Sequence, residues 1–188
     1  MQYQKGGNRP KARSPQAGFT LIELMVTLAV LAILITVAVP SFTDMINNNR
    51  SVALSEALTN ALNFTRSEAV KRGARVSICA SDNGTGCTAA NTWSSGWIVF
   101  VDAAASDGAA PIVGQVLRVK EIEHDKAAIT VDDEQGGAVR FIRFTGLGAL
   151  GRFVPVGFES KISDCTGRSA RDITIGGAGV ISVAKSDC

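Results

Sequence analysis

The stretch that decides the fold is residues 18–39, which read GFTLIELMVTLAVLAILITVAV. Glu23 is its only charged side chain. As a helix rising about 1.5 Å per residue, Phe19–Val39 spans about 31 Å, close to the hydrocarbon thickness of a bilayer. It exceeds the apolar stretch of about 7–15 residues in a secretory signal, and the Pro40 region is a poor match to a signal cleavage site. We therefore expect a single transmembrane helix that stays in the mature protein.

The residues before this helix set its expected orientation. Residues 1–18 carry Lys5, Arg9, Lys11 and Arg13 and no acidic side chain. Because basic residues beside a membrane span stay in the cytoplasm, the N-terminus is predicted to be cytoplasmic and the bulk of the chain to lie across the membrane.

Glu23 needs an explanation, because a carboxylate one turn into a membrane helix costs several kcal/mol without a partner. In one interpretation it reaches the nearby interface. In the other it pairs with a positive charge, and no Lys or Arg lies between residues 19 and 49. That partner would then be another chain or a newly formed N-terminal amine.

Residues 18–26, GFTLIELMV, resemble the class III signal of type IV pilins and type II secretion pseudopilins. In that family a prepilin peptidase cuts after the Gly and methylates the new N-terminal Phe, so the resemblance implies cleavage between Gly18 and Phe19. The family's Glu at the matching place is thought to attract the amine of a neighbouring subunit, which implies an assembly role for Glu23. Pro40 sits where pilin helices commonly kink.

Asp44–Arg72 should continue the helix, since apolar residues of its second half share one arc. Glu68 falls inside this arc, and we expect it to bond a loop lying over the helix. Gly73 is a suitable C-cap. Short β-type runs separated by Gly and Asp/Asn clusters follow. They are Arg75–Cys79, Gly96–Val101, Val116–Glu121, Ala128–Val131, Val139–Phe144, Arg152–Pro155, Asp172–Ile175 and Val180–Val183, the last two flanking a hairpin turn at residues 176–179.

One long helix followed only by strands predicts an α+β fold. The expected architecture is a long N-terminal α-helix, with its first half in the membrane, packed on antiparallel β-sheets. Within residues 61–102, the stretches RSEAV (66–70), VSIC (76–79) and GWIVF (96–100) are similar to the GspH/FimT group of minor pilins and pseudopilins.

All four cysteines, Cys79, Cys87, Cys165 and Cys188, follow the membrane segment, where an even number indicates two disulfides. Three pairings are possible. We favour Cys79–Cys87 with Cys165–Cys188, because each closes a local loop. The gaps between these cysteines do not fit the short spacing of zinc sites.

Little in the chain points to an enzyme. It has a single His, His124, and no Gly-x-Ser-x-Gly motif. Gly146–Gly151 matches the dinucleotide-binding glycine pattern by letter, but a strand-like run and Pro155 follow it where that site needs a helix. We interpret it as a glycine-rich turn, and we expect no cofactor, metal or small-molecule substrate.

The C-terminal part is basic, because residues 140–188 hold seven basic side chains against four acidic ones. Some FimT-type members that bind DNA carry a Gly-Arg-x-Arg motif near the C-terminus. Residues 167–171, GRSAR, resemble it with one extra residue. The hypothesis is a DNA-binding patch of Arg168, Arg171, Lys161 and Lys185, and the alternative is a solvated loop beside Cys165.

These observations predict a leader peptide at residues 1–18, a transmembrane and assembly helix at 19–40, and a periplasmic pilin domain at 41–188. The expected function is that of a minor pilin of a type IV pilus, a non-enzymatic subunit in the bacterial inner membrane that later enters the filament. The alternatives are a DNA-binding minor pilin for transformation and a minor pseudopilin of a type II secretion system. The expected partners are prepilin peptidase, other pilins or pseudopilins and, in the second case, DNA.

Overall fold

The computed structural model describes residues 18–88, 92–133, 137 and 139–188. The expected leader lies outside them except for Gly18. The chain divides into two compact units, Met1–Pro40 and Ser41–Cys188. One helix, α1 (Leu21–Arg72), contributes residues to both and contains Pro40.

The ends of α1 follow from its sequence. At its start, Thr20 Oγ1 accepts a hydrogen bond from the Glu23 N–H at 3.2 Å, which satisfies one of the free donors of the first turn. At its end, Gly73 takes φ +58°. The N–H of Ala74 then donates to the carbonyl of Ala69 at 3.2 Å, so the last turn is closed by the left-handed cap that glycine favours.

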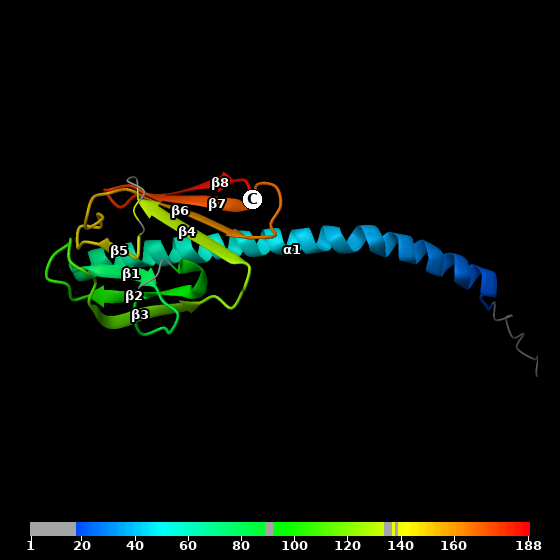
Figure 1. Cartoon of the computed structure of the whole chain (residues 1–188), viewed down its shortest axis with the longest axis horizontal. Coiled ribbons are helices and arrows are strands. Elements are labelled where there is room, and N and C mark those ends of the chain that lie inside the picture. The colour runs from blue at the N-terminus through cyan, green and yellow to red at the C-terminus, as the bar shows by residue number, and fades with distance from the viewer. Residues whose placement is uncertain (1–17, 89–91, 134–136, 138) are drawn as a thin grey trace, which may run out of the picture. The chain divides into compact units, whose positions relative to one another are not determined.

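Two four-stranded antiparallel sheets form the Ser41–Cys188 unit with the second half of α1 (Figure 1). In the first sheet the order is β3 (Val113–Glu121), β2 (Gly96–Asp102), β1 (Val76–Ala80) and β5 (Phe141–Phe144). In the second it is β4 (Ala127–Asp133), β6 (Val156–Ile162), β7 (Ala170–Ile175) and β8 (Ile181–Ser186), and a short 3₁₀ turn, Trp93–Ser95, precedes β2.

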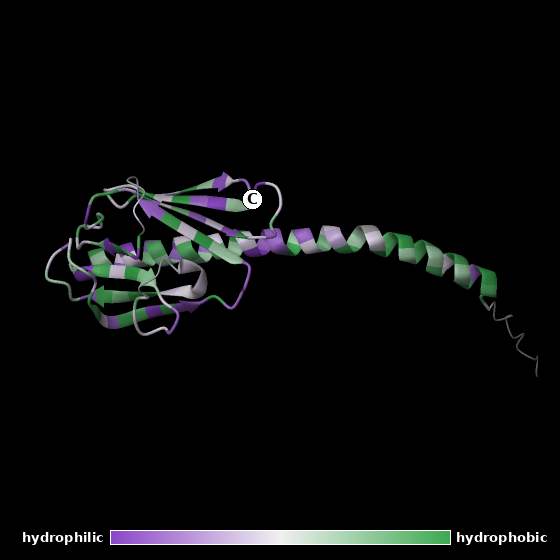
Figure 2. Ribbon diagram, in the orientation of Figure 1, coloured by the Kyte–Doolittle hydropathy of each residue, from purple (hydrophilic) through white to green (hydrophobic). Residues whose placement is uncertain are grey.

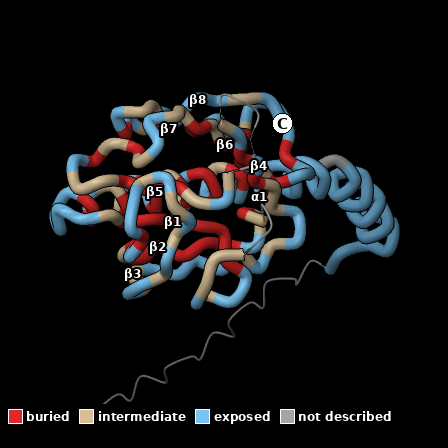
Figure 3. Tube along the Cα trace, turned by 60° about the vertical axis from the view of Figure 1, so that its left-hand side comes forward, coloured by how far each residue is buried: buried red, intermediate tan, exposed pale blue. Residues whose placement is uncertain are grey.

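The core lies where α1 meets both sheets, and Figure 3 shows the buried segments gathered there. Burial alternates along β6, as expected when one sheet face is covered, whereas β1 and β2 are buried along almost their whole length, and β2 is mostly apolar (Figure 2). Trp93 packs edge-on against Phe158 of β6, with ring centroids 5.2 Å apart. The buried side of α1 is the predicted arc, with Leu54, Leu58, Ala61, Leu62, Thr65 and Ala69 buried.

Two expectations were wrong. Arg152–Pro155 is not a strand, and the strand that follows it, β6, was missed. Gly157 and Ser160 lower the β-propensity of β6, yet its alternating burial and its two neighbours hold it in the sheet. Within the described part of the chain, Glu68 bonds no overlying loop. Its carboxylate accepts hydrogen bonds from Arg72 at 2.8 Å and Lys71 at 3.3 Å, both on its own helix.

The cysteines form two disulfides. Cys79 of β1 is bonded to Cys87, with Cα atoms 5.6 Å apart, and Cys165 to Cys188, with Cα atoms 5.7 Å apart. These are the two local pairings that the loop argument favoured. The second bond fastens the segment after β8 to the loop between β6 and β7.

Candidate functional site

The processing site predicted from the sequence lies just before α1. Gly18, Phe19 and Thr20 have no regular secondary structure, and the Phe19 side chain is exposed. A Cβ added to Gly18 would have no neighbour within 4 Å among the residues that the structure describes.

The helix that follows has the character of a membrane span. Its most apolar window has a mean hydropathy of 2.7 and none of that window is buried within the molecule. The hydroxyls of Thr27 and Thr36 donate to the carbonyls of Leu24 and Ile33, so neither polar group is left unsatisfied in an apolar surrounding. This segment can lie in lipid or against other apolar helices.

Glu23 stands alone in this segment. It is exposed, and the described residues offer its carboxylate no ion pair. An unpaired carboxylate in an apolar helix gains most from a cation brought by another molecule. This is the charge that an assembly contact would neutralise.

Three of the four predicted DNA-binding cations meet at one corner of the second sheet. Arg171 of β7 pairs in register with Lys185 of β8. Arg168, in the loop before β7, donates through Nη2 to the carbonyl of Lys185 at 3.1 Å. The guanidinium of Arg171 turns back to the carbonyls of Arg168 and Ala170. We call Arg168, Arg171 and Lys185 the basic corner.

Lys161 does not belong to the basic corner. It follows the buried Ser160 on β6, and Ser160 pairs in register with Arg171, so Lys161 points to the opposite face of the sheet. There it forms an ion pair with Glu159 at 2.6 Å.

The basic corner has few acidic neighbours. Asp187 lies 3.8 Å from Arg168 in a pair whose side chains are both more than half exposed, so it neutralises little charge. Glu56 of α1 shares a groove with Arg171 and Val183. Asp164 is bound by Lys126, whose pKa this hydrogen bond raises.

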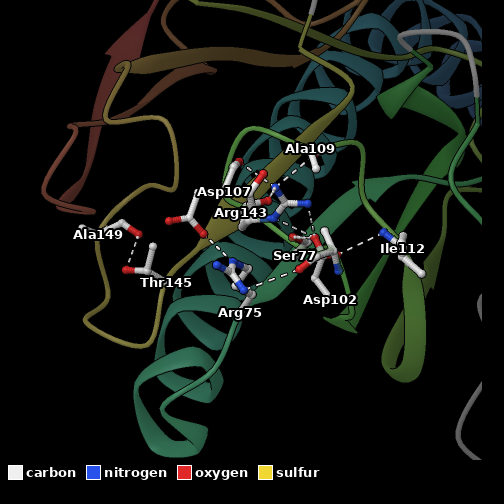
Figure 4. A network of polar contacts seen from close by, with 11 residues as sticks. Arg75, Ser77, Asp102, Asp107, Ala109, Ile112, Arg143, Thr145 and Ala149 are labelled. Atoms are coloured by element: carbon white, nitrogen blue, oxygen red, sulfur yellow. Dashed lines mark hydrogen bonds and ion pairs between the residues drawn. The ribbon is translucent and has the colours of Figure 1, made fainter.

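A buried polar node, centred on Asp102 at the end of β2, was missed by the sequence analysis (Figure 4). Its carboxylate accepts hydrogen bonds from the Ser77 hydroxyl at 2.6 Å, from Arg143 Nε at 2.8 Å, and from the N–H groups of Ala104 and Ile112 at 3.0 Å each. Arg143 Nη2 lies 2.7 Å from the same carboxylate. The side chain of Asp102 is 0% exposed and that of Arg143 is 2% exposed.

The node fixes the loop between β2 and β3. Arg143 Nη1 donates to three loop carbonyls, those of Ser106, Asp107 and Ala109, while Arg75 pairs with Asp107. Burial alone would raise the pKa of Asp102, but the hydrogen bonds from Ser77, Ile112, Ala104 and Arg143 lower it below its usual value. The sequence did contain a signal for a buried charge, because Arg143 interrupts the otherwise apolar strand Phe-Ile-Arg-Phe of β5.

The described residues contain no group of three or more His, Cys, Asp or Glu able to hold a metal ion. The features that stand out are therefore an apolar helix with one carboxylate, a disulfide-fastened sheet domain and a basic corner.

Comparisons with known proteins agree with this picture. Residues 54–179 match the family described as type II transport protein GspH, and residues 13–39 match the prokaryotic N-terminal methylation motif. Two crystal structures of the type IV minor pilin FimU from Pseudomonas aeruginosa strain PAO1 have a similar fold. They share 23% sequence identity with this chain, with TM-scores of 0.55 and 0.52. The first match covers 72% of this chain and 89% of FimU, and the second covers 70% and 90%.

Proposed function

The chain belongs to the GspH family and carries the N-terminal methylation motif, so it is a membrane-anchored minor pilin or pseudopilin, and from this premise we propose that it is a minor pilin of a type IV pilus. The observation that carries the choice of pilus is the fold it shares with FimU across 89% of that minor pilin. The family and the fold are those of structural subunits.

In this proposal, prepilin peptidase removes residues 1–18 and methylates Phe19. Residues 19–40 then hold the subunit in the inner membrane as a single pass, with the N-terminus cytoplasmic and residues 41–188 in the periplasm. The division of the chain at Pro40 and Ser41 supports the boundary between the membrane helix and the periplasmic domain.

Assembly moves the apolar helix from lipid into a bundle of neighbouring pilin helices. The apolar side chains stay away from water throughout, so the transfer does not have to overcome the hydrophobic effect. Glu23 loses water in the bundle, and the Phe19 amine of a neighbour offsets that cost. Pairing between a carboxylate and the amine of the next chain also selects one axial stagger between subunits.

A deletion of the gene tests the pilus assignment against the pseudopilin alternative. We expect loss of twitching motility with secreted enzymes unchanged, and restoration of motility by the wild-type chain. Loss of secreted enzymes with motility intact would instead assign the chain to a type II secretion system.

A second candidate function is DNA binding by the basic corner. The observation that favours it is the convergence of Arg168, Arg171 and Lys185 from a loop and two strands. Three phosphate contacts would give a slope of log affinity against log salt near −2.7, so binding should weaken about 40-fold between 50 and 200 mM salt.

A gel shift with residues 41–188 tests this function. Arg168→Ala/Arg171→Ala should abolish most of the binding, whereas Lys161→Ala is the matched control, because Lys161 lies on the other face of the sheet. No binding of the wild-type domain at low salt, or equal loss in the control, would rule out DNA binding by the basic corner.

A further inference from the structure

The loop between β6 and β7, residues 163–169, carries Arg168 of the basic corner and lies beside α1 and the C-terminus (Figure 1). We call it the corner loop. Most of its residues are exposed, and exposed polar loops are usually the mobile parts of a domain. The backbone of this loop is instead bonded to other segments on both sides of Arg168.

The helix α1 holds one side of the corner loop. Asn48 forms two hydrogen bonds with Thr166: its Oδ1 accepts from the Thr166 N–H at 2.8 Å, and its Nδ2 donates to Thr166 Oγ1 at 3.2 Å. The Ser51 hydroxyl donates to the carbonyl of Ser169 at 2.9 Å. The chain is therefore fixed just before and just after Arg168.

Ser51 occupies a position of α1 where an apolar side chain would be expected. It is fully buried and lies on the same face of the helix as the buried Leu54 and Leu58. A buried hydroxyl costs free energy unless it is hydrogen-bonded. Its bond to the corner loop supplies that partner, so the contact here is directional and fixes the loop in one place.

The C-terminus holds the other side of the corner loop. Gly167 takes φ +63°, a left-handed conformation that glycine adopts without strain, and its carbonyl accepts a hydrogen bond from the Cys188 N–H at 2.9 Å. The disulfide between Cys165 and Cys188 joins the same two segments. The carbonyl of Arg168 itself accepts from Arg171 Nη1 at 3.3 Å. Each residue from 165 to 169 is thus bonded to a group outside the loop.

This restraint keeps like charges together. Arg168, Arg171 and Lys185 repel one another, and the exposed Asp187, 3.8 Å from Arg168, offsets little of that repulsion. A loose corner loop would let Arg168 move away from the other two cations. Holding them together does not stabilise the folded domain, but it removes the cost of ordering them when a polyanion binds.

We propose that Asn48, Ser51 and the Cys165–Cys188 disulfide are positioning groups that hold Arg168 ready for the phosphates of DNA. The inference rests on the proposed DNA-binding function, and it adds to the basic corner a set of residues that act through Arg168. Removing a positioning group should therefore weaken DNA binding only where Arg168 is present.

DNA binding by the full chain in a nonionic detergent tests this role, followed by the fluorescence anisotropy of a short labelled DNA duplex at low salt. The test variant is Asn48→Ala, made in the wild-type chain and in an Arg168→Ala chain. The matched control is Asn63→Ala in the same two chains, because Asn63 is an exposed asparagine of α1 whose amide donates to the Thr59 carbonyl of the same helix.

Asn48→Ala should weaken DNA binding at least about fivefold in the wild-type chain, since the loop must then be ordered during binding. In the Arg168→Ala chain it should change the affinity by less than about twofold, because no Arg168 remains to be positioned. Asn63→Ala should leave both affinities unchanged. No loss from Asn48→Ala in the wild-type chain, or the same loss in both chains, would overturn the positioning role while leaving DNA binding intact.

Hydrogen exchange of the corner loop, measured without DNA, tests the restraint itself. Residues 163–169 should exchange at least about fivefold faster in a Cys165→Ser/Cys188→Ser chain than in the wild type, because the bonds around Gly167 loosen. Equal exchange in the two chains would overturn the part assigned to the disulfide, whether or not DNA binds. A wild-type chain that binds no DNA at low salt would instead contradict the DNA-binding function on which the inference rests.

Discussion

Removing the carboxylate of Asp102 should destabilise the pilin domain more than any change to its surface charges. In Asp102→Ala, the guanidinium of Arg143 stays buried at 2% exposure and loses its only carboxylate partner among the described residues. Breaking a buried ion pair on one side costs about 3–5 kcal/mol, because a charge is left uncompensated.

Two backbone donors add to this cost. The N–H groups of Ala104 and Ile112 lose their acceptor, and each unsatisfied buried donor costs about 1–3 kcal/mol unless the loop opens to water. Since the loop after β2 is held by Arg143 as well, opening it forfeits the bonds to its carbonyls. We therefore expect a total loss of at least about 5 kcal/mol of unfolding free energy.

The assay is urea unfolding of residues 41–188, followed by the fluorescence of the buried Trp93 and Trp97. In thermal unfolding followed by the same fluorescence, a loss of about 5 kcal/mol should lower the Tm by about 10–20 °C for a domain of this size. The matched control is Lys161→Met, which breaks the partly exposed pair with Glu159 and should cost about 1 kcal/mol or less.

A double-mutant cycle separates the ion pair from simple loss of packing. Arg143→Met combined with Asp102→Ala should cost at least about 2 kcal/mol less than the sum of the single variants, because neither charge is then left alone. The reasoning would be refuted if Asp102→Ala lost no more unfolding free energy than the surface control Lys161→Met, with the slope of unfolding free energy against urea concentration unchanged.

Other predictions concern pH, the disulfides and assembly. The lowered pKa of Asp102 contributes stability that is complete above the unfolded value of about 3.9 and is lost as pH falls through the lower folded value. Between pH 5 and 2, the unfolding free energy of Asp102→Asn should therefore depend less on pH than that of the wild type. Equal pH dependence in the two proteins would contradict this. Replacing Cys165 and Cys188 by Ser should cost about 3.4 kcal/mol on the chain-entropy estimate and fray β8, measured by urea unfolding and by hydrogen exchange, and protection of β8 unchanged from wild type would argue against it. Glu23→Ala should remain in the membrane and be processed normally, but its amount in sheared filaments should drop at least tenfold, whereas Glu23→Asp should retain part of the assembly. Full assembly of Glu23→Ala would show that this carboxylate is not needed.

Much of the fold could be predicted from the sequence. The long apolar run, the arc from Leu54 to Ala69 and the C-cap at Gly73 defined α1, because helix periodicity and end signals are local. Most strand positions followed from short β-type runs between turn residues. β6 escaped because its strand character comes from its two neighbours in the sheet and not from its own composition.

The contacts between distant residues could not be predicted in the same way. Asp102 and Arg143 are 41 positions apart, and nothing local marks them as partners. The glycine-rich loop was identified as a turn, but its packing on Gly73 and Gly179 depends on how three segments meet. Among the candidate DNA-binding residues, sheet register decided that Lys161 lies apart from Arg171, and register is set by tertiary pairing.

The central claim is that this chain is cut between Gly18 and Phe19 and enters a filament through the helix that follows. The most direct measurement is mass spectrometry of the N-terminal peptide of this chain in filaments sheared from cells. The account predicts a chain that begins at N-methylated Phe19. A chain that is absent from the filaments, or present there with residues 1–18 still attached, would contradict it.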